Sequence, residues 1–75
     1  MTLLELDERG RPCPLPVIAL GRALRSQAPG SQVILHADDP VVLTDVPAWC
    51  EMVGASVTRM TQGDAGLVTF LIRLP

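Results

Sequence analysis

Two cysteines and one histidine are the side chains of this sequence with the most evident chemistry, and Cys13 has the most informative surroundings. It lies between prolines in the segment Arg11-Pro12-Cys13-Pro14-Leu15-Pro16. Proline is favoured at the first position of a helix, and the residue before a proline is pushed out of the helical region. We therefore expect Cys13 to be the N-cap residue of a helix that begins at Pro14.

This placement predicts a reactive thiol. Because Pro16 has no N–H group, the N–H of Leu15 is the one local donor left for the sulfur, and the helix dipole adds roughly half a positive charge at the same point. Both effects favour the thiolate and would lower the pKa of Cys13 below its usual value of about 8.5. We interpret Cys13 as an exposed, reactive thiol on a stiff segment. The alternative is a buried structural cysteine.

The other two side chains have simpler interpretations. Cys50 falls in mid-helix among apolar neighbours, which predicts a packed core thiol with a raised pKa; a resolving thiol that forms a disulfide with Cys13 is the alternative. His36 falls in a predicted strand, where we expect a packed or solvent-facing side chain, although a base near Cys13 is possible. A metal site made of Cys13, Cys50 and His36 is poorly supported, because the cysteine spacing matches no zinc pattern.

Composition limits the classes of function. The chain has 75 residues, of which 48% are hydrophobic, which predicts a single small domain over residues 1–75. Its net charge is −2, all six basic residues are arginine, and it has only one Trp and one Phe, so we expect no direct nucleic-acid binding. We expect no signal peptide, and no apolar run reaches roughly 20 residues, so we expect a cytoplasmic protein that binds no membrane.

Hydrophobic periodicity predicts the element order βαβαββ. We expect strands at residues 3–8, 32–37, 55–61 and 67–74, one helix at 14–26, and a shorter one within 41–54. Thr44 or Asp45 can cap the second helix, with Pro47 in its first turn. A helix between the first two strands implies a parallel, right-handed crossover. The predicted fold is an α/β (α+β) two-layer sandwich, with a mixed four-stranded sheet and both helices on one face.

The apolar positions indicate which faces are buried. On the two helices and the last strand these are Val17, Ile18, Leu20, Ala23 and Leu24, then Val46, Trp49, Cys50 and Val53, then Val68, Phe70, Ile72 and Leu74. The opposite sheet face carries Glu5, Asp7, Thr69 and Arg73, so we expect it to be open to solvent or to a partner.

Over nearly its whole length the chain resembles the small sulfur-carrier proteins of the TusA/SirA type. The shared features, in order, are Leu6-Asp7, Arg9-Gly10, Cys13-Pro14-Leu15-Pro16, Ala37-Asp38-Asp39-Pro40, Asp45-Val46-Pro47 and Trp49-Cys50. The element order matches as well. The Cys-Pro-x-Pro motif alone would be a weak match, but followed by the Asp-Asp-Pro turn and the Asp-x-Pro helix start it is specific.

The resemblance implies a sulfur carrier or sulfurtransferase. Cys13 matches the cysteine that receives a persulfide from a cysteine desulfurase or a rhodanese-like donor and relays the sulfur to an acceptor protein. Pro14, Leu15 and Pro16 match its motif, and this chemistry needs no cofactor and no metal. Asp38, Asp39 and Asp45 match family positions, and we assign them to turn and cap geometry. Because the chain has no lysine, the candidates for docking contacts are Arg9, Arg11, Arg22 and Arg25.

Other functions remain open at this point. A non-catalytic binding or regulatory module would use the open sheet face, and a thiol–disulfide redox protein would use Cys13 and Cys50. The sequence does not distinguish tRNA thiolation, molybdenum-cofactor synthesis, sulfur oxidation and selenium handling as pathways, and it does not fix the oligomeric state.

Overall fold

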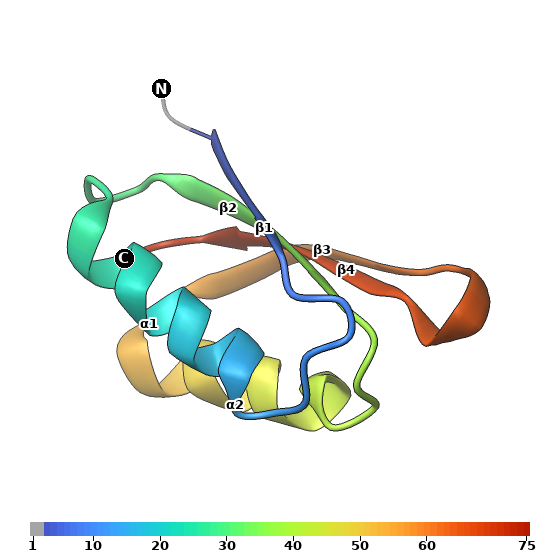
Figure 1. Cartoon of the computed structure of the whole chain (residues 1–75). Coiled ribbons are helices and arrows are strands. Elements are labelled where there is room, and N and C mark those ends of the chain that lie inside the picture. The colour runs from blue at the N-terminus through green and yellow to red at the C-terminus, as the bar shows by residue number, and fades with distance from the viewer. Residues whose placement is uncertain (1–2) are drawn as a thin grey trace.

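The computed structural model describes residues 3–75, and its elements follow the predicted order (Figure 1). The strands are β1 (Leu3–Asp7), β2 (Gln32–Ala37), β3 (Ser56–Gln62) and β4 (Val68–Arg73). The helices are α1 (Leu15–Ser26) and α2 (Val42–Val53), and a short 3-10 turn, η1 (Asp64–Gly66), joins β3 to β4.

The four strands form one mixed sheet in the order β1-β2-β4-β3. β1 and β2 are parallel, and β4 is antiparallel to both of its neighbours, β2 and β3. Both helices cover the same face of this sheet (Figure 1), which confirms the predicted two-layer architecture. Each helix has 12 residues, so α2 is not the shorter one, and no helix in the described part of the chain could cross a membrane.

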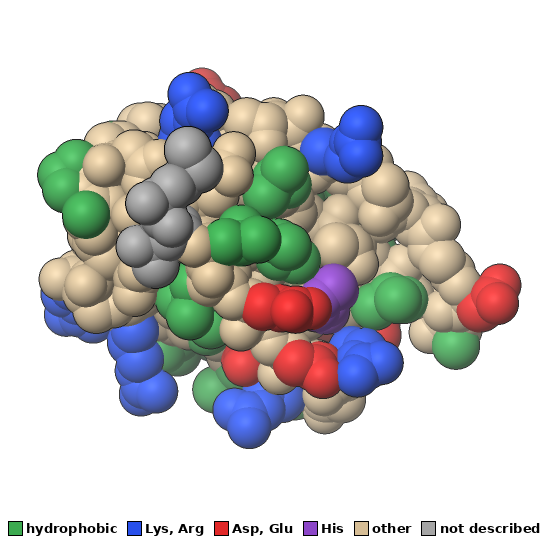
Figure 2. All heavy atoms as spheres, turned by 90° about the horizontal axis from the view of Figure 1, so that it is seen from above, with side chains coloured by type: hydrophobic (Ala, Val, Ile, Leu, Met, Phe, Trp, Pro, Cys, Tyr) green, Lys and Arg blue, Asp and Glu red, His purple; other side chains and the backbone are tan. Residues whose placement is uncertain are grey.

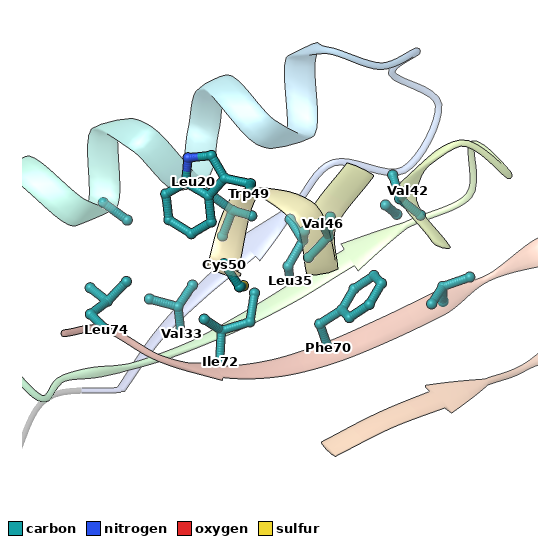
Figure 3. Packing of buried hydrophobic residues seen from close by; sticks show 13 residues of the cluster. Leu20, Val33, Leu35, Val42, Val46, Trp49, Cys50, Phe70, Ile72 and Leu74 are labelled. Carbon is teal, nitrogen blue, oxygen red and sulfur yellow. The ribbon is translucent and has the colours of Figure 1, made fainter. Parts of the chain in front are cut away.

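The core lies between the helices and the sheet (Figure 3). Alternate residues of β2 and β4 point into it, as the period of two in a strand requires. The buried side chains of the sheet and its C-terminal extension are Val33, Leu35, Ala37, Val68, Phe70, Ile72 and Leu74. The helices add Leu20, Ala23, Val42, Val46, Trp49 and Cys50. One prediction is wrong: Ile18 is 44% exposed, because it lies at the edge of the apolar stripe of α1.

The helix starts differ from those predicted. α1 begins at Leu15 with Pro14 as its N-cap, so Cys13 lies one residue outside that position. α2 begins at Val42, and neither Thr44 nor Asp45 caps it. The turn before α2 starts the helix earlier, because Asp39 accepts hydrogen bonds from the N–H of Val41 to its side chain and from the N–H of Val42 to its carbonyl.

The earlier start of α2 changes the environment of two residues. Pro47 lies inside α2 rather than in its first turn. Asp45 falls in the first turn, where its side chain accepts a hydrogen bond from the thiol of Cys13 instead of capping the helix. The predicted end of this helix is confirmed. Gly54 follows α2 in the left-handed conformation, with φ of 82°, and allows the Ala55 N–H to bond to the carbonyl of Cys50.

The sheet face opposite the helices is uncovered, as predicted, and carries a small polar cluster (Figure 2). His36 lies at its centre, with Nδ1 bonded to the hydroxyl of Thr69 at 2.9 Å and Nε2 to the carboxylate of Glu5. The register places these residues side by side, since His36 of β2 faces Thr69 of β4. The histidine is thus a sheet-surface residue with both ring nitrogens in hydrogen bonds.

The burial pattern predicts a sharp contrast between two leucines of the sheet. Leu35 is fully buried, so Leu35→Ala should lower the free energy of unfolding by about 2–5 kcal/mol through lost burial and a residual cavity. Leu3 is 57% exposed, so Leu3→Ala should change it by less than about 0.5 kcal/mol. Urea denaturation followed by circular dichroism measures both. Equal losses for the two variants would contradict the core described above.

Candidate functional site

The site is built where the loop before α1 meets the turn before α2. β1 and β2 are parallel, so the two segments that leave their carboxyl ends lie side by side. The first segment carries Cys13, and the second carries Asp38 and Asp39. Residues distant in the sequence are therefore brought together by one strand pair.

Asp39 fixes the backbone of Cys13. Its Oδ2 accepts the N–H of Cys13 at 2.9 Å, while its Oδ1 accepts the N–H of Val41 at 3.0 Å. One carboxylate thus bridges the Cys13 loop and the start of α2. These two hydrogen bonds to the charged form lower the pKa of Asp39, so it stays ionised at neutral pH.

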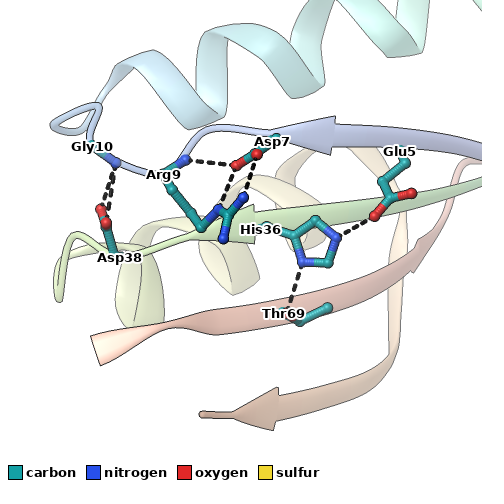
Figure 4. Close-up of polar contacts among 7 residues, drawn as sticks. All are labelled: Glu5, Asp7, Arg9, Gly10, His36, Asp38 and Thr69. Carbon is teal, nitrogen blue, oxygen red and sulfur yellow. Dashed lines mark hydrogen bonds and ion pairs between the residues drawn. The ribbon is translucent and has the colours of Figure 1, made fainter. Parts of the chain in front are cut away.

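Asp38 fixes the same loop three residues earlier. Both of its carboxylate oxygens lie within hydrogen-bonding distance of the N–H of Gly10, at 2.9 and 3.1 Å (Figure 4). Gly10 has a φ of 78°, which favours glycine at this turn. The two neighbouring aspartates therefore bind the Cys13 loop at two points.

The thiol of Cys13 has an acidic partner. Its Sγ donates a hydrogen bond to Oδ2 of Asp45 across 2.9 Å, and the side chain is half-buried. This hydrogen bond, then burial, then the charges of Asp45 and Asp39 raise the pKa of Cys13 to about 11. At neutral pH the group is a thiol.

The prediction that the pKa of Cys13 is lowered is therefore wrong, and its side chain is half-buried rather than exposed. The Leu15 N–H, which was expected to reach the sulfur, donates to the carbonyl of Pro12 at 3.0 Å instead. The positive end of α1 is outweighed because the segment that faces the sulfur carries two carboxylates. Sequence reasoning treated Asp45 as a cap residue only and missed its contact with Cys13.

The proline motif shapes the mouth of the site. Pro14 is exposed and directly follows the cysteine, Leu15 is 42% exposed, and Pro16 is buried within the first turn of α1. Beside the thiol, a shallow groove runs between the two helices. Its lining residues are Pro14, Val17, Asp45, Ala48, Trp49 and Met52.

The four arginines proposed for docking do not form one patch. Arg9 makes a bidentate ion pair with Asp7, with nitrogen–oxygen distances of 2.9 and 2.7 Å (Figure 4). Arg11 lies 3.9 Å from Glu8, and together with Arg22 it lines a second groove, between α1 and β1. Arg25 lies in the last turn of α1 and lines neither groove.

Cys50 and His36 lie apart from the thiol of Cys13. Cys50 is 3% exposed in the core beneath α2, where burial raises its pKa, as predicted for a packed thiol (Figure 3). His36 lies on the opposite face of the sheet, between Glu5 and Thr69. Within residues 3–75 no cluster of three or more His, Cys, Asp or Glu side chains is arranged to hold a metal ion.

A comparison with known protein families shows which family the chain belongs to. The sequence profile of the family described as "Sulfurtransferase TusA" matches residues 4–74. The chain belongs to the TusA sulfurtransferase family. The predicted resemblance is thereby confirmed, and the match includes the Cys13 loop, the Asp38-Asp39 turn and α2.

The TusA fold is also found in a solved structure. The crystal structure of a SirA-like protein from Desulfitobacterium hafniense superposes with a TM-score of 0.81 over 96% of each chain, at 23% sequence identity. At this identity the match supports the βαβαββ fold. The TusA family membership itself rests on the sequence match.

The hydrogen bonds of Asp39 predict a local effect on the Cys13 loop of this TusA protein. Asp39→Ala should speed amide hydrogen exchange at Cys13 and Val41, because both N–H groups lose their acceptor. The Gly10 amide should keep its protection, because Asp38 still accepts its hydrogen bond.

Nuclear magnetic resonance of the exchanging amides measures this. Asp64→Ala, which removes an exposed acid from the turn between β3 and β4, is the matched control and should leave Cys13 unchanged. Unaltered exchange at Cys13 in Asp39→Ala would contradict the bridge.

Proposed function

We propose that this protein is a sulfur carrier that holds a persulfide on Cys13. The observation that supports this most directly is the contrast between its two thiols. Cys13 lies at the surface on a loop fixed by two aspartates, whereas Cys50 is sealed in the core. Family membership suggests the class of chemistry, and this contrast supports Cys13 as the atom that carries it out.

The reaction is a thiol exchange in two steps. In the first, Sγ of Cys13 attacks the terminal sulfur of a persulfide on a donor protein, the donor's S–S bond breaks, and the donor cysteine leaves as a thiolate. The proton of Cys13 ends on that thiolate or in solvent. In the second, a thiolate of an acceptor attacks the terminal sulfur on Cys13. The S–S bond on Cys13 breaks, and Sγ of Cys13 leaves as a thiolate. No external oxidant or reductant is consumed.

The donor we propose is a cysteine desulfurase or a rhodanese-like protein, and the acceptor is a further protein. Two successive partners must reach the same sulfur, so the site has to be shallow. The mouth formed by Pro14 and Leu15 is consistent with this, because both residues are exposed next to Cys13. Transient contacts of this kind are small and partly polar.

Intact mass spectrometry tests the proposal. After incubation with a cysteine desulfurase and L-cysteine, the wild type should gain about 32 Da, the mass of one sulfur, and lose it with a reductant. Cys13→Ala should gain nothing. Cys50→Ala, which keeps the surface thiol, should gain sulfur as the wild type does.

The outcome that contradicts the proposal is equally specific. Sulfur uptake that persists in Cys13→Ala and is lost in Cys50→Ala would exclude Cys13 as the carrier atom. No uptake by the wild type from desulfurase and rhodanese donors would exclude the proposed function.

A further inference from the structure

The resting state of Cys13 is poorly suited to the proposed function, and the inference below rests on that function. As an acceptor of sulfur Cys13 must be a thiolate, and as a donor of sulfur it must be a good leaving group, which requires a low pKa. The hydrogen bond to Asp45 acts against both, because it favours the protonated thiol. The environment of the sulfur therefore has to change when a partner docks.

Asp45 is the group through which a partner can make this change. Among residues 3–75, its carboxylate accepts a hydrogen bond only from Cys13 and has no cation within ion-pair distance. It is also the one charged residue that lines the groove between α1 and α2. The other walls are apolar: Val17 and Pro14 on one side, and Ala48, Trp49 and Met52 on the other.

We propose that this groove receives a basic side chain, arginine or lysine, from the sulfur-transfer partner, and that its cation draws Asp45 away from the Cys13 thiol. The chemistry of the groove selects this occupant. An unpaired carboxylate between apolar walls complements a cation on an aliphatic stem, which is the structure of both basic side chains. Met52, at 77% exposed, is available to cover that stem.

Within residues 3–75 no arginine pairs with Asp45, so the cation we propose belongs to the partner. Arg9 is held by Asp7, Arg11 lies beside Glu8, and Arg22 lines the groove on the other side of α1. Asp39 cannot replace Asp45 as the target, because both of its oxygens already accept backbone N–H groups. Asp45 is therefore the carboxylate at the site that is free to form a new ion pair.

The change is a movement of charge with no net oxidation. When the partner's cation pairs with Asp45, the carboxylate no longer stabilises the S–H form. Cys13 then loses its proton to the leaving sulfur of the donor as the new S–S bond forms. Away from a partner the group returns to the less reactive thiol. Asp45 is thus a positioning residue that restricts sulfur exchange to the docked complex.

Two rates measured on the same variant test this. The first is alkylation of Cys13 by iodoacetamide, a small neutral reagent that reports thiolate formation in the free protein. Asp45→Asn should speed it several-fold and at most about tenfold, since a larger thiolate fraction is partly offset by weaker nucleophilicity.

The second rate is sulfur uptake from a cysteine desulfurase charged with L-cysteine. In Asp45→Asn the carrier concentration for half-maximal uptake should rise at least about threefold, because the ion pair with the partner is lost. The rate at saturating carrier should not fall. Asp45→Glu keeps the charge and should restore part of the affinity. Glu51→Gln removes an exposed acid from the same helix and should leave both rates unchanged.

Each other outcome overturns the inference. If Asp45→Asn takes up sulfur at a lower half-saturating concentration, Asp45 only suppresses the thiol and does not bind the partner. If its alkylation rate is unchanged, Asp45 does not hold the proton on Cys13. If the wild type accepts no sulfur at all, the proposed function itself fails. In that case faster alkylation of Asp45→Asn than of the wild type would still show that Asp45 holds the proton on Cys13, so the two failures can be told apart.

Discussion

The site depends on one constraint, the parallel pairing of β1 with β2. This pairing brings the loop that follows β1 against the turn that follows β2, and three carboxylates then act on the loop. Asp38 binds Gly10, Asp39 binds the N–H of Cys13, and Asp45 binds its thiol. Without that register, Cys13 would lie on a flexible connection with no fixed partner.

The two cysteines lie in different parts of the structure, one in the hydrophobic core and one at the candidate site. The buried layer between the helices and the sheet contains Cys50, whereas Cys13 lies outside this layer on the loop before α1. The carboxylates that hold the loop also disfavour a negative charge on the sulfur. In the free protein Cys13 is therefore a half-buried thiol with low reactivity. This is consistent with transfer that takes place only between docked proteins.

The sequence predicted most of the fold because its elements are marked by local patterns. The mostly apolar run of β2, the alternation in β4, the proline-rich start of α1 and Gly54 after α2 each have a local physical cause. The start of α2 was placed too late, because Asp39 begins the helix from outside the periodic segment. The thiol environment was missed for a related reason. The effect of the helix dipole on Cys13 can be predicted from the residues next to it, whereas Asp45 lies 32 residues away from Cys13 in the sequence.

The central claim is that Asp45 holds Cys13 as a thiol in the free protein, and the most direct measurement is the thiol pKa itself. Protein labelled with carbon-13 at cysteine Cβ reports ionisation of each sulfur by its chemical shift as pH is raised. We expect the Cys13 signal to remain that of a thiol through pH 9 and to titrate with a midpoint of about 11. A midpoint at or below the ordinary value of about 8.5 would contradict the account.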